Sequence, residues 1–362
     1  MRILYDGGIY AMQTAGGINR YFANIINRLP ADFAPTITTC QRREVNSPTN
    51  PNLKTFYFQR FGFRPGRVSY WLEKRYFQAV TRFTTQNLLH PTYYTLLTGQ
   101  EITPSRLPIV LTVHDMIHEL YYPHDQTIES KRKAITAAQS IICVSENTKK
   151  DLLERFSIPE ERITVTYLAS ELDVSLSYGS ESVPDAPYFL YVGSRASYKN
   201  FDTLLSAFAK AYSIRPDFRL VVVGSPFNKQ EIAQIVDLNL QQQIDYVGHS
   251  TDTHLAKLYR CSLSLVYPSR YEGFGIPPLE AMSCGTVAIA ANTSSIPEVV
   301  GDAGILFDPD AVADLADSLL FLGDNPIERG RLIQKGLERC KQFSWDKTVA
   351  QTVDVYRSTI GN

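Results

Sequence analysis

One stretch of the chain decides the fold: Tyr271-Glu-Gly-Phe-Gly-Ile-Pro-Pro-Leu-Glu280. The apolar run 261–268 before it predicts a buried strand. Pro277 and Pro278 suit the first turn of a helix, where backbone N–H groups lack intrahelical partners in any case. Gly285 can end that helix by adopting a left-handed conformation. The stretch therefore predicts a strand, a glycine turn and a helix N-terminus, which expose N–H groups to an anionic or hydroxyl-rich ligand.

Two carboxylates flank this turn. Glu272 falls in the predicted turn, and we expect Glu280 in the first turn of the helix. A first-turn Glu is common because it complements the helix dipole, so Glu280 alone carries little weight. The two acceptors and the row of N–H donors between them nevertheless have the polarity that recognition of a polyol requires.

The composition is that of a soluble globular protein with two domains. The chain has 362 residues, of which 44% are hydrophobic and 20% are charged. The net charge of -1 argues against binding of nucleic acid, which depends on concentrated positive charge. The five cysteines are scattered, so we expect reduced thiols in a cytoplasmic protein and no metal site. We find no membrane-spanning run and no signal peptide before the charged Arg2 and Asp6.

Strand and helix patterns alternate in two series, which predicts an α/β protein with parallel sheets. The first series has strand candidates at 2–6, 34–39, 109–113, 140–145 and 163–167. The second has strand candidates at 188–192, 218–223, 244–247, 263–267 and 286–290. The region 173–187 is rich in Ser, Pro and Gly and predicts a linker. We therefore expect domains at 1–172 and 188–342, followed by an amphipathic helix in 343–362.

The stretch 271–280 and the text after it resemble the Glu motif of the retaining glycosyltransferases of family 4. The resemblance continues through Ala281-Met-Ser-Cys-Gly-Thr-Val-Ala-Ile-Ala290 and Asn292-Thr-Ser-Ser-Ile-Pro-Glu298. It implies the GT-B fold, in which two Rossmann-like domains face a central cleft. It also implies that the C-terminal helix crosses back to the first domain.

Two cations follow the first strand of the second domain. Arg195 can grip phosphate oxygens with a bidentate fork, and Lys199 adds a compact point charge. Both could be solvated loop residues, but open α/β folds bind ligands at this end of a strand. The segment resembles the diphosphate-binding loop of the family, with one residue fewer between the two cations. We expect both to stabilise a departing diphosphate without a metal ion or other cofactor.

Two features of the first domain are also candidates. Gly16 and Gly17 precede the helix predicted at 18–29 and would let the backbone approach a diphosphate and a sugar closely. A plain turn is the alternative for this glycine pair. His114 ends the strand 109–113, where a histidine can simply anchor a loop. The resemblance implies instead that His114 hydrogen-bonds the transferred sugar.

The resemblance also assigns roles to the two glutamates. It implies that Glu272 contacts hydroxyls of the donor sugar and that Glu280 holds the ribose hydroxyls. The turn between them would complete the sugar pocket with Gly273 and with the N–H groups of Phe274, Gly275 and Ile276. We do not interpret the glutamates as the acid and nucleophile of a glycosidase, which flank one bond.

The segment 54–83 is basic and aromatic. Its seven cations are opposed only by Glu73: Lys54, Arg60, Arg64, Arg67, Lys74, Arg75 and Arg82. Such a segment can lie on an anionic membrane and reach a lipid-linked acceptor. The alternative is that its apolar side chains face the core at helical spacing, namely Leu72, Tyr76, Val80 and Phe83. We favour core packing for the aromatics and leave membrane contact open for the cations.

The sequence thus predicts a retaining, metal-independent hexosyltransferase that uses a nucleotide-diphosphate sugar, GDP-mannose or a UDP-hexose. We expect a glycan or lipid-linked acceptor in polysaccharide biosynthesis, and a cytoplasmic location at or near the inner face of a membrane. The alternatives are a non-catalytic sugar-nucleotide-binding protein and a GT-B epimerase. An NAD-dependent oxidoreductase is disfavoured because the loop after the first strand lacks the third fingerprint glycine.

Overall fold

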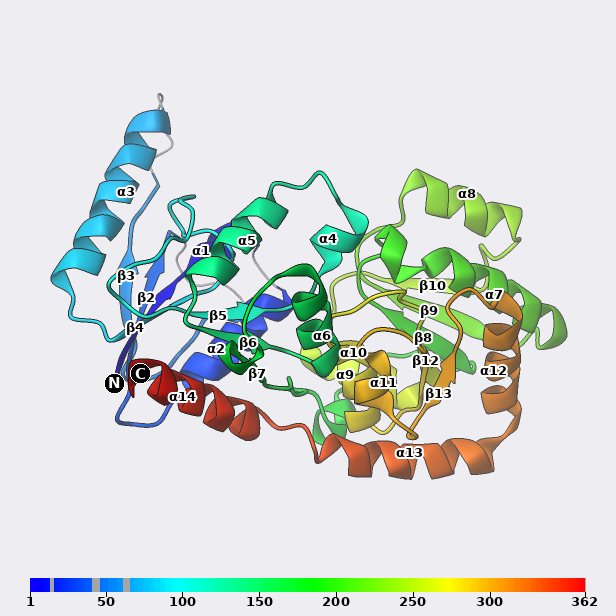
Figure 1. The fold of residues 1–362 in the computed structure, drawn as a ribbon. Helices are drawn as coiled ribbons and strands as arrows, with labels where there is room; N and C mark the ends of the chain where they lie inside the picture. Colours follow the sequence, from blue (N-terminus) through cyan, green and yellow to red (C-terminus); the bar gives the residue numbers. More distant parts are fainter. Residues whose placement is uncertain (14–15, 41–45, 61–65, 362) are drawn as a thin grey trace. The chain divides into compact units, whose positions relative to one another are not determined.

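The structure is a computed structural model that describes residues 1–13, 16–40, 46–60 and 66–361 (Figure 1). Two compact units make up the chain: Met1–Leu168 with Trp345–Asn362, and Ala169–Ser344. We call them unit 1 and unit 2. The expected linker 173–187 belongs to unit 2, where Val174–Tyr178 forms the 3-10 helix η2 packed against α9 (Asp252–Cys261). The domain boundaries expected from the sequence stay predictions.

Unit 1 is built on parallel strands. A four-stranded sheet has the order β3-β2-β1-β4, and a three-stranded sheet has the order β5-β6-β7. A parallel bridge from Leu89 to Ile109 joins β4 to the start of β5. The strands are β1 (Arg2–Asp6), β2 (Ala34–Thr39), β3 (Lys54–Tyr57), β4 (Leu88–Pro91), β5 (Val110–Val113), β6 (Ser140–Cys143) and β7 (Ile163–Val165).

Seven α-helices are described in unit 1: α1 (Gly8–Met12), α2 (Gly17–Asn27), α3 (Gly66–Phe83), α4 (Ile117–Tyr121), α5 (Thr127–Ala137), α6 (Glu146–Arg155) and α14 (Trp345–Gly361). The 3-10 helix η1 spans Glu160–Arg162. Ser145 is the N-cap of α6, because its hydroxyl accepts a hydrogen bond from the Thr148 N–H at 2.9 Å.

The last helix, α14, packs against unit 1 beside α2, as the expected fold requires (Figure 1). Its Tyr356 hydroxyl lies 3.0 Å from the Tyr5 hydroxyl and 2.6 Å from Nδ1 of His90. Nε2 of His90 lies 2.9 Å from the Thr112 hydroxyl of β5. This buried polar chain fixes α14 to both sheets of unit 1, because each of these groups would be costly to leave unpaired.

Unit 2 contains one parallel sheet of six strands in the order β10-β9-β8-β11-β12-β13. The strands are β8 (Tyr188–Val192), β9 (Arg219–Val223), β10 (Ile244–Val247), β11 (Ser264–Tyr267), β12 (Ala288–Ala291) and β13 (Ile305–Phe307). Its helices are η2, η3 (Ser197–Lys199), α7 (Phe201–Ile214), α8 (Lys229–Asp237), α9, α10 (Ile276–Ser283), α11 (Ile296–Val300), α12 (Val312–Asp324) and α13 (Pro326–Cys340).

The strand order of unit 2 reverses between β8 and β11. From β8 the chain adds β9 and β10 on one side, and from β11 it adds β12 and β13 on the other. Strands β11 and β12 are buried along their whole length, as expected for a parallel sheet covered on both faces. Ligands of open α/β sheets bind at such a reversal, at the carboxyl ends of the strands.

The basic segment differs in part from its prediction. On α3, Ser69, Glu73, Phe77 and Val80 are buried. Leu72 and the aromatic side chains of Tyr70 and Trp71 are exposed, so the expected core packing is wrong for these three. The helix turns one face inward through residues spaced three and four apart, and Leu72 lies outside that row. Phe61, Phe63 and Arg64 lie outside the described residues, as do the side chains of Arg67, Arg82 and Phe83. No helix in the described ranges is long and apolar enough to cross a membrane.

Candidate active site

The turn after β11 forms as the sequence predicts. Gly275 has a φ of 113°, and α10 begins directly after it with Pro277 and Pro278 in its first turn. Gly285, with a φ of 77°, follows the end of the helix. Because α10 begins at Ile276, Glu280 lies beyond the first turn, and that part of the prediction is wrong.

Two serines that the sequence reasoning missed hold this turn. The Ser294 hydroxyl accepts from the Glu272 N–H at 3.0 Å. The buried Ser295 hydroxyl is 2.8 Å from the carbonyl oxygens of both Glu272 and Phe274. The stretch after β12 thereby fixes the backbone that carries Glu272.

Lys199 and Glu272 meet at the strand reversal. Nζ of Lys199 lies 2.7 Å from Oε1 of Glu272, and the side chains are 16% and 10% exposed. Lys199 follows β8 and Glu272 follows β11, so the sheet brings together residues 73 positions apart. Nδ2 of Asn200 also donates to the carbonyl oxygens of Pro268 and Pro309, at 3.1 and 2.8 Å, which ties the two loops together. The pair presents a cation and a carboxylate side by side.

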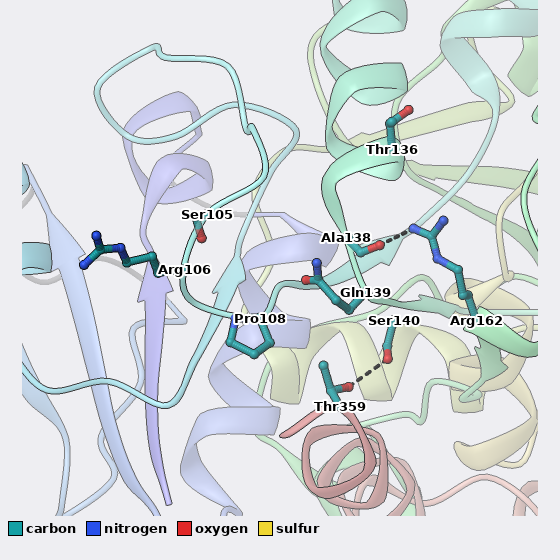
Figure 2. Close-up of a pocket in the computed structure, with 9 residues that line it drawn as sticks. All are labelled: Ser105, Arg106, Pro108, Thr136, Ala138, Gln139, Ser140, Arg162 and Thr359. Atoms are coloured by element: carbon teal, nitrogen blue, oxygen red, sulfur yellow. Dashed lines mark hydrogen bonds between the residues drawn. The ribbon is translucent and has the colours of Figure 1, made fainter. Parts of the chain in front are cut away.

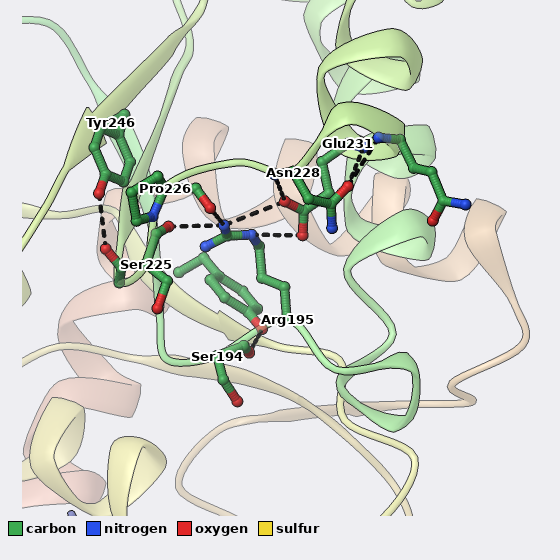
Figure 3. Close-up of polar contacts among 10 residues, drawn as sticks. Ser194, Arg195, Ser225, Pro226, Asn228, Glu231 and Tyr246 are labelled. Carbon is green, nitrogen blue, oxygen red and sulfur yellow. Dashed lines mark hydrogen bonds and ion pairs between the residues drawn. The ribbon is translucent and has the colours of Figure 1, made fainter.

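Arg195 is held within the protein (Figure 3). Its Nε donates to Oε1 of Glu231 at 2.8 Å, and its Nη2 donates to Oε2 of Glu231 at 3.2 Å. Nη2 also donates to the carbonyl oxygens of Ser225 and Pro226, at 2.7 and 2.8 Å. The side chain is 4% exposed, so in this arrangement the bidentate edge expected for phosphate is already used. The role of Arg195 stays a prediction.

Glu280 is buried, and its Oε2 accepts a hydrogen bond from the Tyr259 hydroxyl at 3.0 Å. Phe274 is buried against Phe343, with ring centroids 5.9 Å apart. The structure thus places Glu272 in the turn between β11 and α10 and Glu280 within α10 itself. Their expected contacts with a donor remain predictions.

The candidates in unit 1 lie at the ends of two elements. Gly16 is the N-cap of α2 and has an extended backbone, and Gly17 is the first residue of this helix. A Cβ on Gly16 would come within 2.7–2.8 Å of the Gln13 side chain, which is close but involves a flexible neighbour. The requirement for glycine is therefore modest in this structure.

His114 directly follows β5 and packs edge-on against Tyr21, with ring centroids 5.2 Å apart. Its Nε2 is buried and has no partner among the described residues. Burial lowers the pKa of His114 to about 4; the charge of Asp115 opposes this shift, and that of Lys131 adds to it. The ring is therefore neutral near pH 7 and offers a hydrogen bond rather than a charge.

A cavity of about 600 Å³ also lies in unit 1, at the amino ends of β5, β6 and β7 (Figure 2). It is lined by Ser105, Arg106, Pro108, Thr136, Ala138, Gln139, Ser140, Arg162 and Thr359. The Arg162 guanidinium donates to the carbonyls of Ile135 and Ala138 at the end of α5. As far as the structure describes it, this lining contains none of the predicted site residues.

The described part of the chain contains no group of three or more His, Cys, Asp or Glu residues placed to hold a metal ion.

Glu231 was also missed by the sequence reasoning. Its signal is the capping-box pattern with Asn228 three residues before it, which the structure contains in full at the start of α8.

Family models cover most of the chain. The model for glycosyl transferases group 1 matches residues 179–339, and the model for glycosyltransferase family 4 matches residues 15–173. The chain is 32% identical over 272 residues to O-antigen chain mannosyltransferase B from Escherichia coli. That match covers 70% of this chain and 71% of the relative.

Solved structures share the fold over the full length. Sucrose-phosphate synthase from Thermosynechococcus elongatus has a TM-score of 0.78 at 21% identity, with 99% of both chains covered. Anabaena Alr3699/HepE, solved with UDP and glucose, has a TM-score of 0.74 at 17% identity, covering 99% of this chain and 100% of that one. With its two Rossmann-like units in the GT-B fold, the chain belongs to the group 1, family 4 glycosyltransferases.

Proposed function

We propose that this glycosyltransferase moves a hexose from a nucleotide-diphosphate sugar to a glycan or lipid-linked acceptor, with retention of configuration and without a metal ion. The observation that carries the proposal is the Lys199–Glu272 pair at the strand reversal of unit 2. The name of the Escherichia coli relative, an O-antigen chain mannosyltransferase, favours mannose and polysaccharide synthesis. UDP in the Anabaena structure supports a nucleotide donor but leaves a UDP-hexose open.

Each residue of the site has a different role. Lys199 stabilises the diphosphate as its charge develops, once the phosphate competes with Glu272 for the ammonium group. Glu272 then accepts hydrogen bonds from sugar hydroxyls, while Glu280 holds the ribose. The bond from the anomeric carbon to the diphosphate breaks, and a bond to the acceptor oxygen forms on the same face. The acceptor proton passes to the departing phosphate oxygen.

A non-catalytic sugar-nucleotide-binding protein and an epimerase remain the rival functions. The discriminating experiment incubates the protein with GDP-mannose or a UDP-hexose and measures release of the nucleoside diphosphate, with and without a glycan acceptor. We expect slow release alone and faster release with acceptor. A binding protein releases none, and an epimerase converts the sugar while it stays on the nucleotide.

We propose, in addition, that α3 contacts the inner face of an anionic membrane, where a lipid-linked acceptor would lie. Trp71 is 54% exposed, and Tyr70 and Val68 are exposed beside it. The Arg75 guanidinium lies 5.6 Å from the centre of the Trp71 ring. The acid Glu73 is turned inward and paired with Arg60 at 2.9 Å, so it does not offset the charges of Lys74 and Arg75.

Co-sedimentation with vesicles tests this contact. We expect binding to vesicles that contain anionic lipid, less binding at high salt, and a loss of severalfold on Trp71→Ser. The matched control is Ile327→Ser, which removes an 88% exposed apolar side chain from unit 2. Equal binding of Trp71→Ser and the control would refute the contact.

A further inference from the structure

The two cations of unit 2 differ in how firmly their carboxylate partners hold them. Lys199 makes one ion pair with Glu272, and each side chain keeps some exposure to solvent. Arg195 makes four hydrogen bonds through Nε and Nη2, to Glu231 and to two backbone carbonyls. An anionic ligand can therefore replace the partner of Lys199 far more readily than those of Arg195.

Aromatic rings complete the enclosure of Arg195. The guanidinium carbon lies 4.7 Å from the Phe227 ring centre and 5.6 Å from that of Phe201. Phe227 belongs to the β9–α8 loop and Phe201 begins α7. Arg195 thus links the loop after β8 to the loop after β9 and to the start of α8, as Figure 3 shows for its polar contacts.

Glu231 is in turn fixed by its own helix. Its Oε2 accepts from the Asn228 N–H at 2.7 Å, and the Asn228 side chain accepts from the Glu231 N–H at 2.9 Å. This capping box fixes the position of the Glu231 carboxylate independently of its contact with the Arg195 guanidinium. The position of Arg195 is therefore set by the N-terminus of α8.

The remaining nitrogen of the Arg195 side chain, Nη1, takes no part in these four hydrogen bonds. Nη1 is buried and has no partner among the described residues. It lies 3.6 Å from where a Cβ on Gly224 would stand, at the turn after β9. Gly193, at the turn after β8, has open space where its Cβ would be. A buried N–H donor without a hydrogen-bond partner raises the free energy of the folded state. A small opening of the turns at Gly193 and Gly224 that lets an anionic oxygen bind Nη1 would remove this cost.

We infer that Glu231 is a positioning residue, which holds Arg195 so that Nη1 alone is presented to the diphosphate of the donor. The inference rests on the proposed function and deepens it. Arg195 then contributes one directed hydrogen bond from a fixed position, whereas Lys199 contributes a mobile charge. The sequence predicts that the bidentate edge of Arg195 contacts the diphosphate, whereas in this inference only Nη1 makes that contact.

The test measures dissociation constants of the full chain for a nucleoside diphosphate and for the matching nucleoside, in wild type and Glu231→Gln. Glutamine can still accept from Asn228, so the cap of α8 is kept while the charge is lost. We expect the diphosphate to bind about tenfold more weakly and the nucleoside to change less than about twofold. Purely structural damage would weaken both ligands together.

The matched control is Asp245→Asn. It breaks another arginine–carboxylate pair of unit 2, with Arg219, whose two hydrogen bonds are 2.5 and 2.6 Å. We expect this variant to bind both ligands as wild type does. Arg195→Lys, which keeps the charge but cannot make all four hydrogen bonds, should reproduce the selective loss if Glu231→Gln does not fold.

Two outcomes would refute this inference without refuting the proposed function. Tighter binding of the diphosphate to Glu231→Gln would mean that Glu231 competes with phosphate for the fork, and unchanged binding would mean that Glu231 does not position Arg195. If wild type binds no nucleoside diphosphate at all, the proposed function fails as well.

Discussion

Ionisable side chains at the carboxyl ends of the strands have different environments in the two units. In unit 2, Lys199 and Arg195 are each matched by a carboxylate, at 2.7 and 2.8 Å. In unit 1, Asp6 at the end of β1 is buried and His114 after β5 is partly buried, and desolvation is the main influence on both groups. Burial raises the pKa of Asp6 to about 7 and lowers that of His114 to about 4, so each is shifted toward its neutral form.

These environments determine where charge can develop. A paired cation retains its charge. Lys199, which has a single carboxylate partner, can exchange that partner for an anionic ligand, which suits a departing diphosphate. The neutral His114 ring offers a hydrogen bond without attracting ions, which suits sugar hydroxyls.

Removing Glu272 should have the largest effect. We expect Glu272→Ala to lower kcat about 100- to 1,000-fold, because the sugar loses its acceptor in the transition state. Nucleoside diphosphate should bind at least as tightly as to wild type, because Lys199 loses its internal partner. Initial rates and calorimetric titration measure the two effects. Glu328→Ala, which breaks the surface pair with Arg331, is the control, and parallel loss of rate and binding would contradict the exchange of partners.

The burial of Asp6 predicts how stability depends on pH. Its pKa is raised to about 7 from 3.8 by burial, so folding binds a proton in that interval. The stability contributed by the protonated form is present at low pH and is lost as pH rises through about 7. Asp6→Asn should therefore gain about 4 kcal/mol relative to wild type between pH 4 and pH 8, measured by urea unfolding. A difference that stays constant over this range would refute the shift.

The neutral ring of His114 predicts a modest and pH-independent contribution. We expect His114→Ala to lower kcat/KM about tenfold, the worth of one good hydrogen bond. Because the pKa is lowered to about 4, the ring does not titrate between pH 5.5 and 8. Wild type and variant should thus give parallel pH–rate profiles. An acidic limb near pH 6.5 that disappears in the variant would show a group that ionises during catalysis.

Local patterns predicted the parts of the site that depend on neighbouring residues. The glycines and prolines around Glu272 were sufficient for the turn and α10, since they restrict the backbone directly. Strands β3, β4 and β13 were missed. β3 has no buried residue, β4 ends in His90 and Pro91, and β13 has only three residues, so none of them shows a clear apolar run. The Arg195–Glu231 pair joins residues 36 positions apart, and the expectation of a free guanidinium ignored the carboxylate that the fold brings to it.

The central claim is that Lys199 exchanges Glu272 for the diphosphate of a donor. Calorimetric titration of wild type and Lys199→Ala with GDP, UDP and the corresponding nucleosides tests it most directly, with Lys341→Ala, which breaks an exposed pair with Glu338, as control. We predict that one diphosphate binds wild type and the control alike and binds Lys199→Ala about 10- to 100-fold more weakly, with the nucleoside unaffected. Equal affinity of wild type and Lys199→Ala for that diphosphate would contradict the account.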